Sequence, residues 1–101
     1  MAAAVIETKP QFNLGNIYLT PWAIEALAGE NPGRLLKAHQ TLEMGELSYP
    51  DYQENLLSVR EGFRIFSAFR TANGTKIWII SEAVGEDGLR ESTVILTPSE
   101  Y

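Results

Sequence analysis

Apolar residues follow two different periods along this chain, one typical of helices and the other of strands. From residue 21 to residue 60 they recur at every third or fourth position, and from Phe63 onward they alternate with polar residues. A period near 3.6 indicates helices with one buried side, whereas a period of two indicates strands. The order of the two patterns predicts an α+β fold, in which three short helices pack on an antiparallel meander of three to four strands.

Polar capping residues mark the start of each predicted helix. A proline follows each of them within two positions, and proline suits the first turn of a helix because it has no N–H to donate. The starts are Thr20-Pro21, Asn31-Pro32 and the segment 48–51, which resembles a capping box. The predicted helices cover residues 21–28 and 32–44, and a third helix is capped by Ser48 and runs to Arg60.

The strongest strand signal lies in residues 61–83, EGFRIFSAFRTANGTKIWIISEA, where two alternating segments flank Asn73-Gly74. An Asn-Gly pair suits a two-residue type I′ turn, because both central residues of that turn need a positive φ. With this turn, Phe69 would lie opposite Trp78.

Shorter alternating segments predict further strands at residues 16–20 and 92–98, with the polar residues 84–91 as a connection. Residues 1–13 show no clear period and are predicted to be a loose leader. The remaining residues, 14–101, are predicted to form one domain, as expected for a chain of 101 residues.

Apolar side chains would occupy both faces of the hairpin in this register. One face would carry Phe63, Ile65, Phe69, Trp78 and Ile80, and the other Phe66, Ala68, Ile77 and Ile79. Three short helices can cover only one face, and an exposed apolar face of this size normally marks an interface. We therefore expect a homodimer through the sheet. The alternative is that the leader covers this face with Val5, Ile6, Phe12 and Leu14.

Composition changes this picture mainly by excluding partners. The net charge is −5 and the isoelectric point about 4.8, which disfavours nucleic-acid binding because such binding depends on basic residues. The absence of cysteine excludes disulfides and thiolate metal sites. No apolar run approaches the roughly 20 residues of a membrane span, and the first residues do not resemble a signal peptide. We expect a cytoplasmic protein with a protein partner and with no cofactor, metal or membrane contact.

Four stretches, GNIYLTPWAIEAL, ELSYPDYQEN, EGFRIFSAFRTANGTKIWIISEA and TVILTPSEY, together resemble a family of short bacterial proteins. These proteins are carried on plasmids, prophages and other mobile elements, and are usually labelled plasmid-related or hypothetical and sometimes mislabelled as type I restriction subunits. The chain departs from the family at residues 84–91, where the family's turn is usually shorter. The resemblance implies a mobile-element setting and no particular reaction.

Six polar residues near the hairpin and the third helix are candidates for a binding site. They are Arg64, Arg70, Lys76, Glu82, Asp51 and Asn55. Charges that prevent strand edges from aggregating would explain the basic residues without a function, and the helix dipole would explain Asp51. Asn55 is a poor helix former in mid-helix and is harder to explain locally, which leaves a hydrogen bond that the fold needs and a ligand contact as two open alternatives.

His39 is the only histidine, and it lies four residues before Glu43. On one helix the two side chains could share a metal or exchange a proton. Two ligands are too few for a metal site, so we expect a half-buried structural histidine and no catalytic residue.

The expected function is that of a non-enzymatic accessory protein of a mobile genetic element, which acts by binding another protein. An anti-defence version would inhibit a host nuclease or a CRISPR-type effector by occupying its basic cleft. The alternative is a RelE/ParE-like RNA-cleaving toxin domain that uses the basic hairpin, with Glu82 and Glu61 as candidates for the general acid or base.

Overall fold

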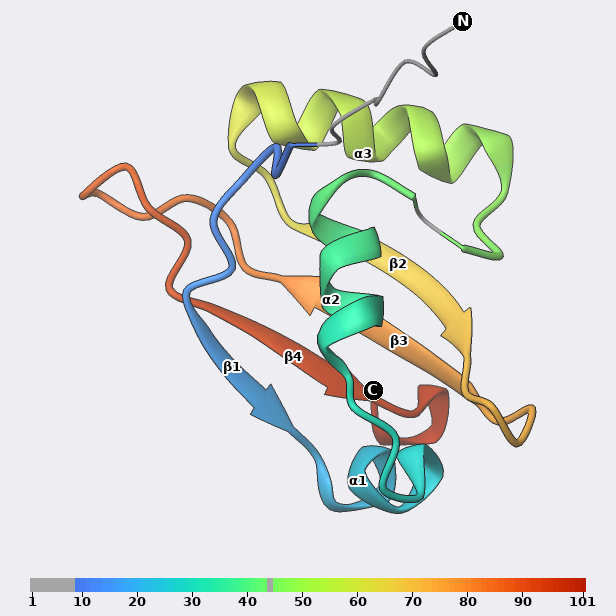
Figure 1. Cartoon of the computed structure of the whole chain (residues 1–101). Coiled ribbons are helices and arrows are strands. Elements are labelled where there is room, and N and C mark those ends of the chain that lie inside the picture. Colours follow the sequence, from blue (N-terminus) through green and yellow to red (C-terminus); the bar gives the residue numbers. More distant parts are fainter. Residues whose placement is uncertain (1–8, 44) are drawn as a thin grey trace, which may run out of the picture.

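A four-stranded sheet forms the centre of the molecule in this computed structural model, which describes residues 9–43 and 45–101 (Figure 1). The strands are β1 Asn16–Leu19, β2 Ile65–Arg70, β3 Lys76–Ser81 and β4 Ser92–Leu96, in the spatial order β1-β4-β3-β2. Strands β2, β3 and β4 form the predicted antiparallel meander, whereas β1 pairs in parallel with β4. The α+β fold is therefore confirmed, with a mixed sheet in place of an antiparallel one.

Three α-helices accompany the sheet in the described residues. They are α1 Pro21–Leu27, α2 Gly33–Gln40 and α3 Tyr49–Glu61, and a 3₁₀ turn, η1 Pro98–Glu100, follows β4. Two predicted caps are confirmed: Thr20 accepts a hydrogen bond from the Ala23 N–H at 3.2 Å, and Ser48 accepts one from the Asp51 N–H at 3.4 Å. No helix in this part of the chain is long and apolar enough to cross a membrane.

Helix α2 is shorter than the helix predicted at residues 32–44. It begins at Gly33, whose N–H donates to the Asn31 side chain at 2.8 Å, so Asn31 forms a turn before the helix instead of its cap. It ends at Gln40, because Leu42 adopts a left-handed φ of 67° that an α-helix cannot continue.

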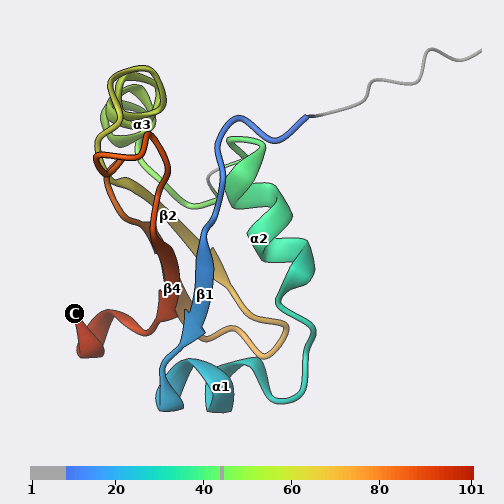
Figure 2. The ribbon, with the colours of Figure 1, turned by 90° about the vertical axis from the view of Figure 1, so that its left-hand side faces the viewer.

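Helices α1 and α2 lie on one face of the sheet, and α3 lies beside the sheet, next to β2 (Figure 2). The main core fills the space between α1, α2 and this face. Its buried members are Ala23, Ala26, Leu27, Leu35, Leu36, Ile77, Ile79 and Ile95. Because side chains alternate along a strand, the neighbours of the last three residues point to the opposite face.

The hairpin register differs by one residue from the predicted register. The Gly74 N–H donates to Thr71 C=O and the Thr71 N–H donates to Thr75 C=O, both at 2.9 Å, and Gly74 has a φ of 87°. This is a three-residue loop with its glycine in the left-handed region, not a two-residue type I′ turn. Phe69 therefore faces Ile77, and the prediction that it faces Trp78 is wrong.

This shift exchanges the two faces of β3. A shift of one residue turns every side chain of a strand to the other face of the sheet. Trp78 and Ile80 consequently lie on the face of Phe66 and Ala68, away from the helices, and the predicted grouping with Ile65 is wrong.

Residues 11–13 are fastened to the domain, although the sequence predicts a loose leader there. The Gln11 N–H donates to Gln40 C=O, and the Gln40 side chain donates to Phe12 C=O, both at 2.8 Å. Phe12 packs on a histidine of α2, and Leu14 packs against the main core, so neither covers the second face of the sheet. The other proposed covering residues, 5 and 6, lie outside the described residues.

Candidate functional site

The face of the sheet opposite α1 and α2 carries an apolar surface, which we call the open face. It is formed by alternating residues of three strands and by Tyr101. The accessible members are Phe66, Trp78, Val94 and Tyr101, whereas Ala68, Ile80 and Leu96 on the same face are buried. The Trp78 ring makes edge contacts with the rings of Phe66 and Tyr101, at centroid distances of 5.0 and 5.6 Å. A groove of about 300 Å³, lined by these three rings with Arg64 and Ile80, lies on this face.

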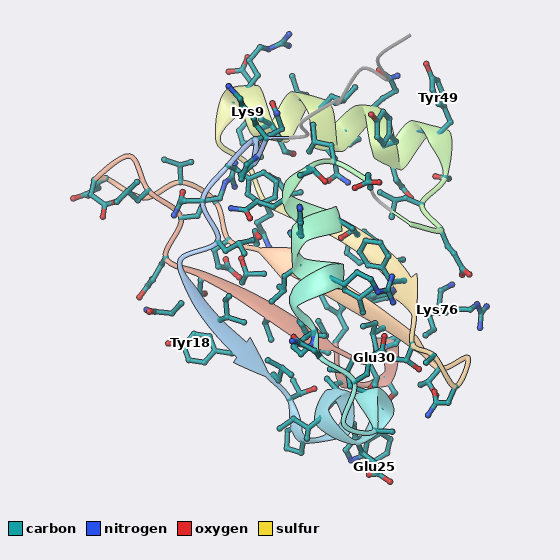
Figure 3. The ribbon with its side chains drawn as sticks, viewed as in Figure 1. Lys9, Tyr18, Glu25, Glu30, Tyr49 and Lys76 are labelled. Atoms are coloured by element: carbon teal, nitrogen blue, oxygen red, sulfur yellow. The ribbon has the colours of Figure 1, made fainter. Side chains whose placement is uncertain are left out.

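Charged residues border the open face at its two ends. At one end Arg64 pairs with Glu82 at 4.0 Å, and at the other Arg70 pairs with Glu46 at 2.8 Å. Lys76 lies opposite Arg70 in the register and is exposed (Figure 3). The three predicted basic residues therefore form no single patch, and both arginines already have a carboxylate partner.

Asn55 is the predicted site residue whose role the structure shows most directly. Its side chain is buried, donates to the Phe66 C=O and accepts from the Phe66 N–H at 3.0 Å. Phe66 lies on β2, an outer strand of the sheet, so the amide of Asn55 takes the place of a neighbouring strand. Of the two alternatives for Asn55, the structure shows the hydrogen bond that the fold needs, whereas Asp51 is exposed in the first turn of α3, away from the groove.

His39 is fully buried and belongs to a chain of hydrogen bonds that crosses the sheet. Its Nδ1 contacts the Ser67 hydroxyl, and its Nε2 lies 2.9 Å from the Ser81 hydroxyl. The Ser81 hydroxyl lies 2.6 Å from the Thr93 hydroxyl, which donates to Leu14 C=O at 2.7 Å. The chain therefore links β2, β3 and β4 to the residues just before β1.

The directions of these hydrogen bonds fix the protonation of His39. Because Thr93 donates to a carbonyl, it must accept from Ser81, and Ser81 must then accept from Nε2–H of His39. Burial disfavours a second proton on the ring, so His39 is the neutral Nε2–H tautomer near neutral pH, with Nδ1 accepting from Ser67. Burial lowers the pKa of His39 from 6.5 to about 3, and the positive charge of Arg90 contributes to the shift.

Arg90 joins three segments of the chain beside this network. Its guanidinium is buried and donates to the carbonyls of Phe63 at 2.6 Å, Glu82 at 2.8 Å and Ser58 at 3.1 Å. It also lies over the ring of Phe12, 5.4 Å from the centroid. Arg90 therefore anchors the 84–91 connection, which the sequence describes only as polar.

The buried chain of hydrogen-bonded side chains contains the residue types of a nucleophilic catalytic site, but solvent and substrates have no access to it. Ser67, Ser81 and His39 are all 0% exposed, so no substrate reaches them in this conformation. The expectation that His39 and Glu43 share one helix is wrong, because α2 ends at Gln40 and the Glu43 carboxylate accepts from Thr41. Within residues 9–43 and 45–101, no group of three histidine, cysteine or acidic side chains could hold a metal.

The sequence predicts the charged candidate residues, but it does not predict the residues that form the aromatic groove and the buried hydrogen-bond network. The aromatic groove joins residues from β2 and β3 with Tyr101, and only the correct register places Trp78 and Phe66 on one face. Ser67, Ser81 and Thr93 carried a usable signal, because each is a hydroxyl at an inward position of an otherwise apolar strand. No comparable signal marks Arg90.

Comparison of the chain with protein-family models, with curated proteins and with solved structures finds no match in any of the three.

Proposed function

We propose that this chain is a non-enzymatic protein that acts by binding another protein through its open face. The observation that carries the proposal is the aromatic groove of Phe66, Trp78 and Tyr101, which lies on the side of the sheet without α1 and α2. Aromatic side chains are enriched at the centres of protein interfaces. A concave aromatic surface suits a large apolar side chain of a partner as its anchor.

The net charge of the whole chain supports a basic partner, although side chains of both signs border the open face itself. The chain has a net charge of −5, and the border of the open face at Glu82 continues into a segment with Glu86, Asp87 and Glu91. Opposite charge across an interface speeds association and selects partners. We therefore propose a partner that carries an exposed apolar side chain beside lysines or arginines. A nuclease with a basic cleft, inhibited on behalf of a mobile element, is one concrete version of this proposal, for which the sequence resemblance implies only the mobile-element setting.

A matched pair of tyrosines allows this proposal to be tested without disturbing the fold. Tyr101 contacts the groove and Tyr49 lies on α3, away from it (Figure 3), and both are 73% exposed. A protein captured by the wild type from an extract of the source organism should be purified and its dissociation constant measured by calorimetry. Tyr101→Ala should weaken binding by about tenfold or more, in the range of an interface anchor, while Tyr49→Ala should leave the constant unchanged.

Two results would contradict the proposal. Equal losses from Tyr101→Ala and Tyr49→Ala would show that the groove is not the contact surface. Growth arrest on expression, relieved by Arg70→Ala, would support the RNA-cleaving toxin instead.

A further inference from the structure

The two outer strands of the sheet differ in what covers their free edges. β2 is one outer strand and β1 is the other. On the β2 edge, Asn55 bonds both main-chain groups of Phe66, and the Glu46 N–H donates to Ala68 C=O at 2.7 Å. No described residue makes a comparable bond to the outer edge of β1.

The pairing of β1 with β4 shows which of its main-chain groups face outward. The N–H of Asn16 donates to Glu91 C=O at 2.9 Å, and that of Thr20 donates to Ile95 C=O at 3.0 Å. Because alternate residues of a strand direct their main-chain groups to the same side, Ile17 and Leu19 direct theirs away from β4. An uncovered row of such groups is a template for another strand.

The side chains of β1 do not discourage pairing. Natural edge strands are often protected by charged residues or proline, and residues 16–20, NIYLT, contain neither. Ile17 and Tyr18 are 44% and 57% exposed, so both faces of the strand present apolar surface to solvent. Tyr18 extends outward from the edge of the sheet (Figure 3).

We propose that β1 pairs with β1 of a second copy of this chain, in antiparallel orientation about a two-fold axis at Tyr18. In that register Ile17 of one copy lies opposite Leu19 of the other, and the outward groups of these two residues exchange four hydrogen bonds across the dimer. Tyr18 then lies opposite Tyr18 in the pair that exchanges no hydrogen bonds, where side chains approach most closely.

A second copy fits this edge because the strand is complementary to itself. The pairing places tyrosine beside tyrosine on one face and isoleucine beside leucine on the other, and such cross-strand pairs are favourable. Residues 16–20 bring no like charges together, although the whole chain has a net charge of −5. Because the two copies are related by a two-fold axis, each contact between them occurs twice.

The dimer would contain one continuous sheet of twice four strands, with both open faces on the same side. Strand pairing of this length buries less surface than a standard interface, so we expect a dissociation constant of roughly 1 to 100 micromolar. The inference concerns a different surface from the groove, and its test is independent of any partner.

Engineered cysteines test the register directly, because the natural chain contains none. Residues opposite each other without hydrogen bonds have Cα atoms about 4.5 Å apart, which suits a disulfide. Tyr18→Cys should therefore form a disulfide-linked dimer under mild oxidation. Ile24→Cys is the matched control, since Ile24 is 58% exposed on α1. Tyr18→Cys should be oxidised about tenfold faster or more, because pairing raises the effective thiol concentration.

Sedimentation equilibrium of the wild type and of Ile17→Pro provides a second measurement. The proline removes an outward N–H and leaves the bonds to β4 in place, so the fold should persist while dimerisation weakens by about tenfold or more. A wild-type chain that stays monomeric up to roughly millimolar concentration, above the expected range, would overturn the proposal. Equal oxidation rates of the two cysteine variants would overturn it as well. If the edge instead accepts the strand of a different protein, or the chain's own residues 1–8, the purified chain will be monomeric.

Discussion

The two outer edges of the sheet, at β2 and at β1, differ in whether their outward main-chain groups are hydrogen-bonded. The β2 edge is covered by the side chain of Asn55 and by the chain at Glu46, which bond the N–H and C=O of Phe66 and the C=O of Ala68. The outer edge of β1 has no such cover among the described residues. The difference shows that one amide side chain can terminate a sheet as a further strand would, and it indicates which edge is available for pairing.

The glycine at position 45 explains how the chain approaches the β2 edge so closely. Gly45 forms an isolated bridge with Ala68 and has a φ of 71°. A Cβ placed there would lie 2.0 Å from the Ala68 carbonyl oxygen. The cover of β2 thus depends on a position that only glycine occupies without strain, whereas no corresponding constraint protects β1.

Acid should lower the free energy of unfolding of the whole sheet, because the hydrogen-bonded chain through His39 runs from β2 to the residues just before β1. The pKa of His39 is lowered to about 3 in the folded protein and returns to 6.5 on unfolding. Between these values the unfolded chain binds a proton that the folded protein excludes, so stability is retained above pH 6.5 and falls as the pH decreases towards 3. The loss amounts to about 1.4 kcal/mol per pH unit, or roughly 4–5 kcal/mol in total.

Urea unfolding between pH 7.5 and pH 4 measures this dependence. His39→Gln is the control, because glutamine keeps one donor and one acceptor but does not titrate. This variant should be less stable than the wild type at pH 7.5 and should show a flatter pH dependence. Equal pH slopes in the two proteins would mean that His39 is not the group responsible.

Asn55→Asp should open the β2 edge alone. The carboxylate can still accept from the Phe66 N–H, but it cannot donate to Phe66 C=O and it places a charge in a buried position. We expect the free energy of unfolding to fall by about 3 kcal/mol. Asn16→Asp at the exposed β1 edge makes the same chemical change and should alter it by less than about 0.5 kcal/mol. Similar losses in the two variants would show that the edges do not differ.

Gly45→Ala should disturb the other contact that covers the β2 edge, in which the Glu46 N–H donates to the Ala68 C=O. Gly74→Ala is its control, because Gly74 has a similar φ of 87° but no atom within 4 Å of an added Cβ. The control should lose about 1 kcal/mol from backbone strain alone, and Gly45→Ala about 2 kcal/mol or more, since the chain must also move away from Ala68. Thermal unfolding of the two variants gives the difference, and the absence of one would argue against close packing at Gly45.

Arg70→Gln should have the smallest effect on the β2 edge. The side chains of Arg70 and Glu46 are 53% and 44% exposed, so solvent weakens their attraction despite the 2.8 Å contact. We expect a change below about 1 kcal/mol that disappears in 1 M salt. A larger loss, insensitive to salt, would mean that this pair holds the edge closed.

The sequence predicts well those parts of the fold that local chemistry determines. Thr20 and Ser48 begin helices because a hydroxyl before a proline-containing turn satisfies N–H groups that otherwise lack partners. The hairpin register is different, because Asn73-Gly74 fits both a two-residue and a three-residue loop with glycine at positive φ. Choosing between them requires the packing of Trp78 against its neighbours on the open face, which is not local information.

The candidate site depended almost entirely on such distant contacts. Asn55 was recognised as unusual because it weakens its own helix, but its partner Phe66 lies on another element. The contacts of Arg90 and Tyr101 are with residues that are distant in the sequence, and neither residue belongs to a recognisable sequence pattern. The parallel partner of β1 was equally hidden, because a strand of four residues does not encode which distant strand it joins.

That parallel pairing also bears on how quickly the protein folds. Asn13 bonds Arg90 across a separation of 77 residues, and Thr20 bonds Glu100 across 80. Contacts between such distant positions close large loops before they gain stability, so we expect folding to be slower than in a helical protein of similar length. During synthesis β1 emerges from the ribosome long before β4 exists, while the β2–β3 hairpin can form as soon as it appears. Because β4 is its neighbour in the sheet, β1 cannot take its place there until β4 has been made.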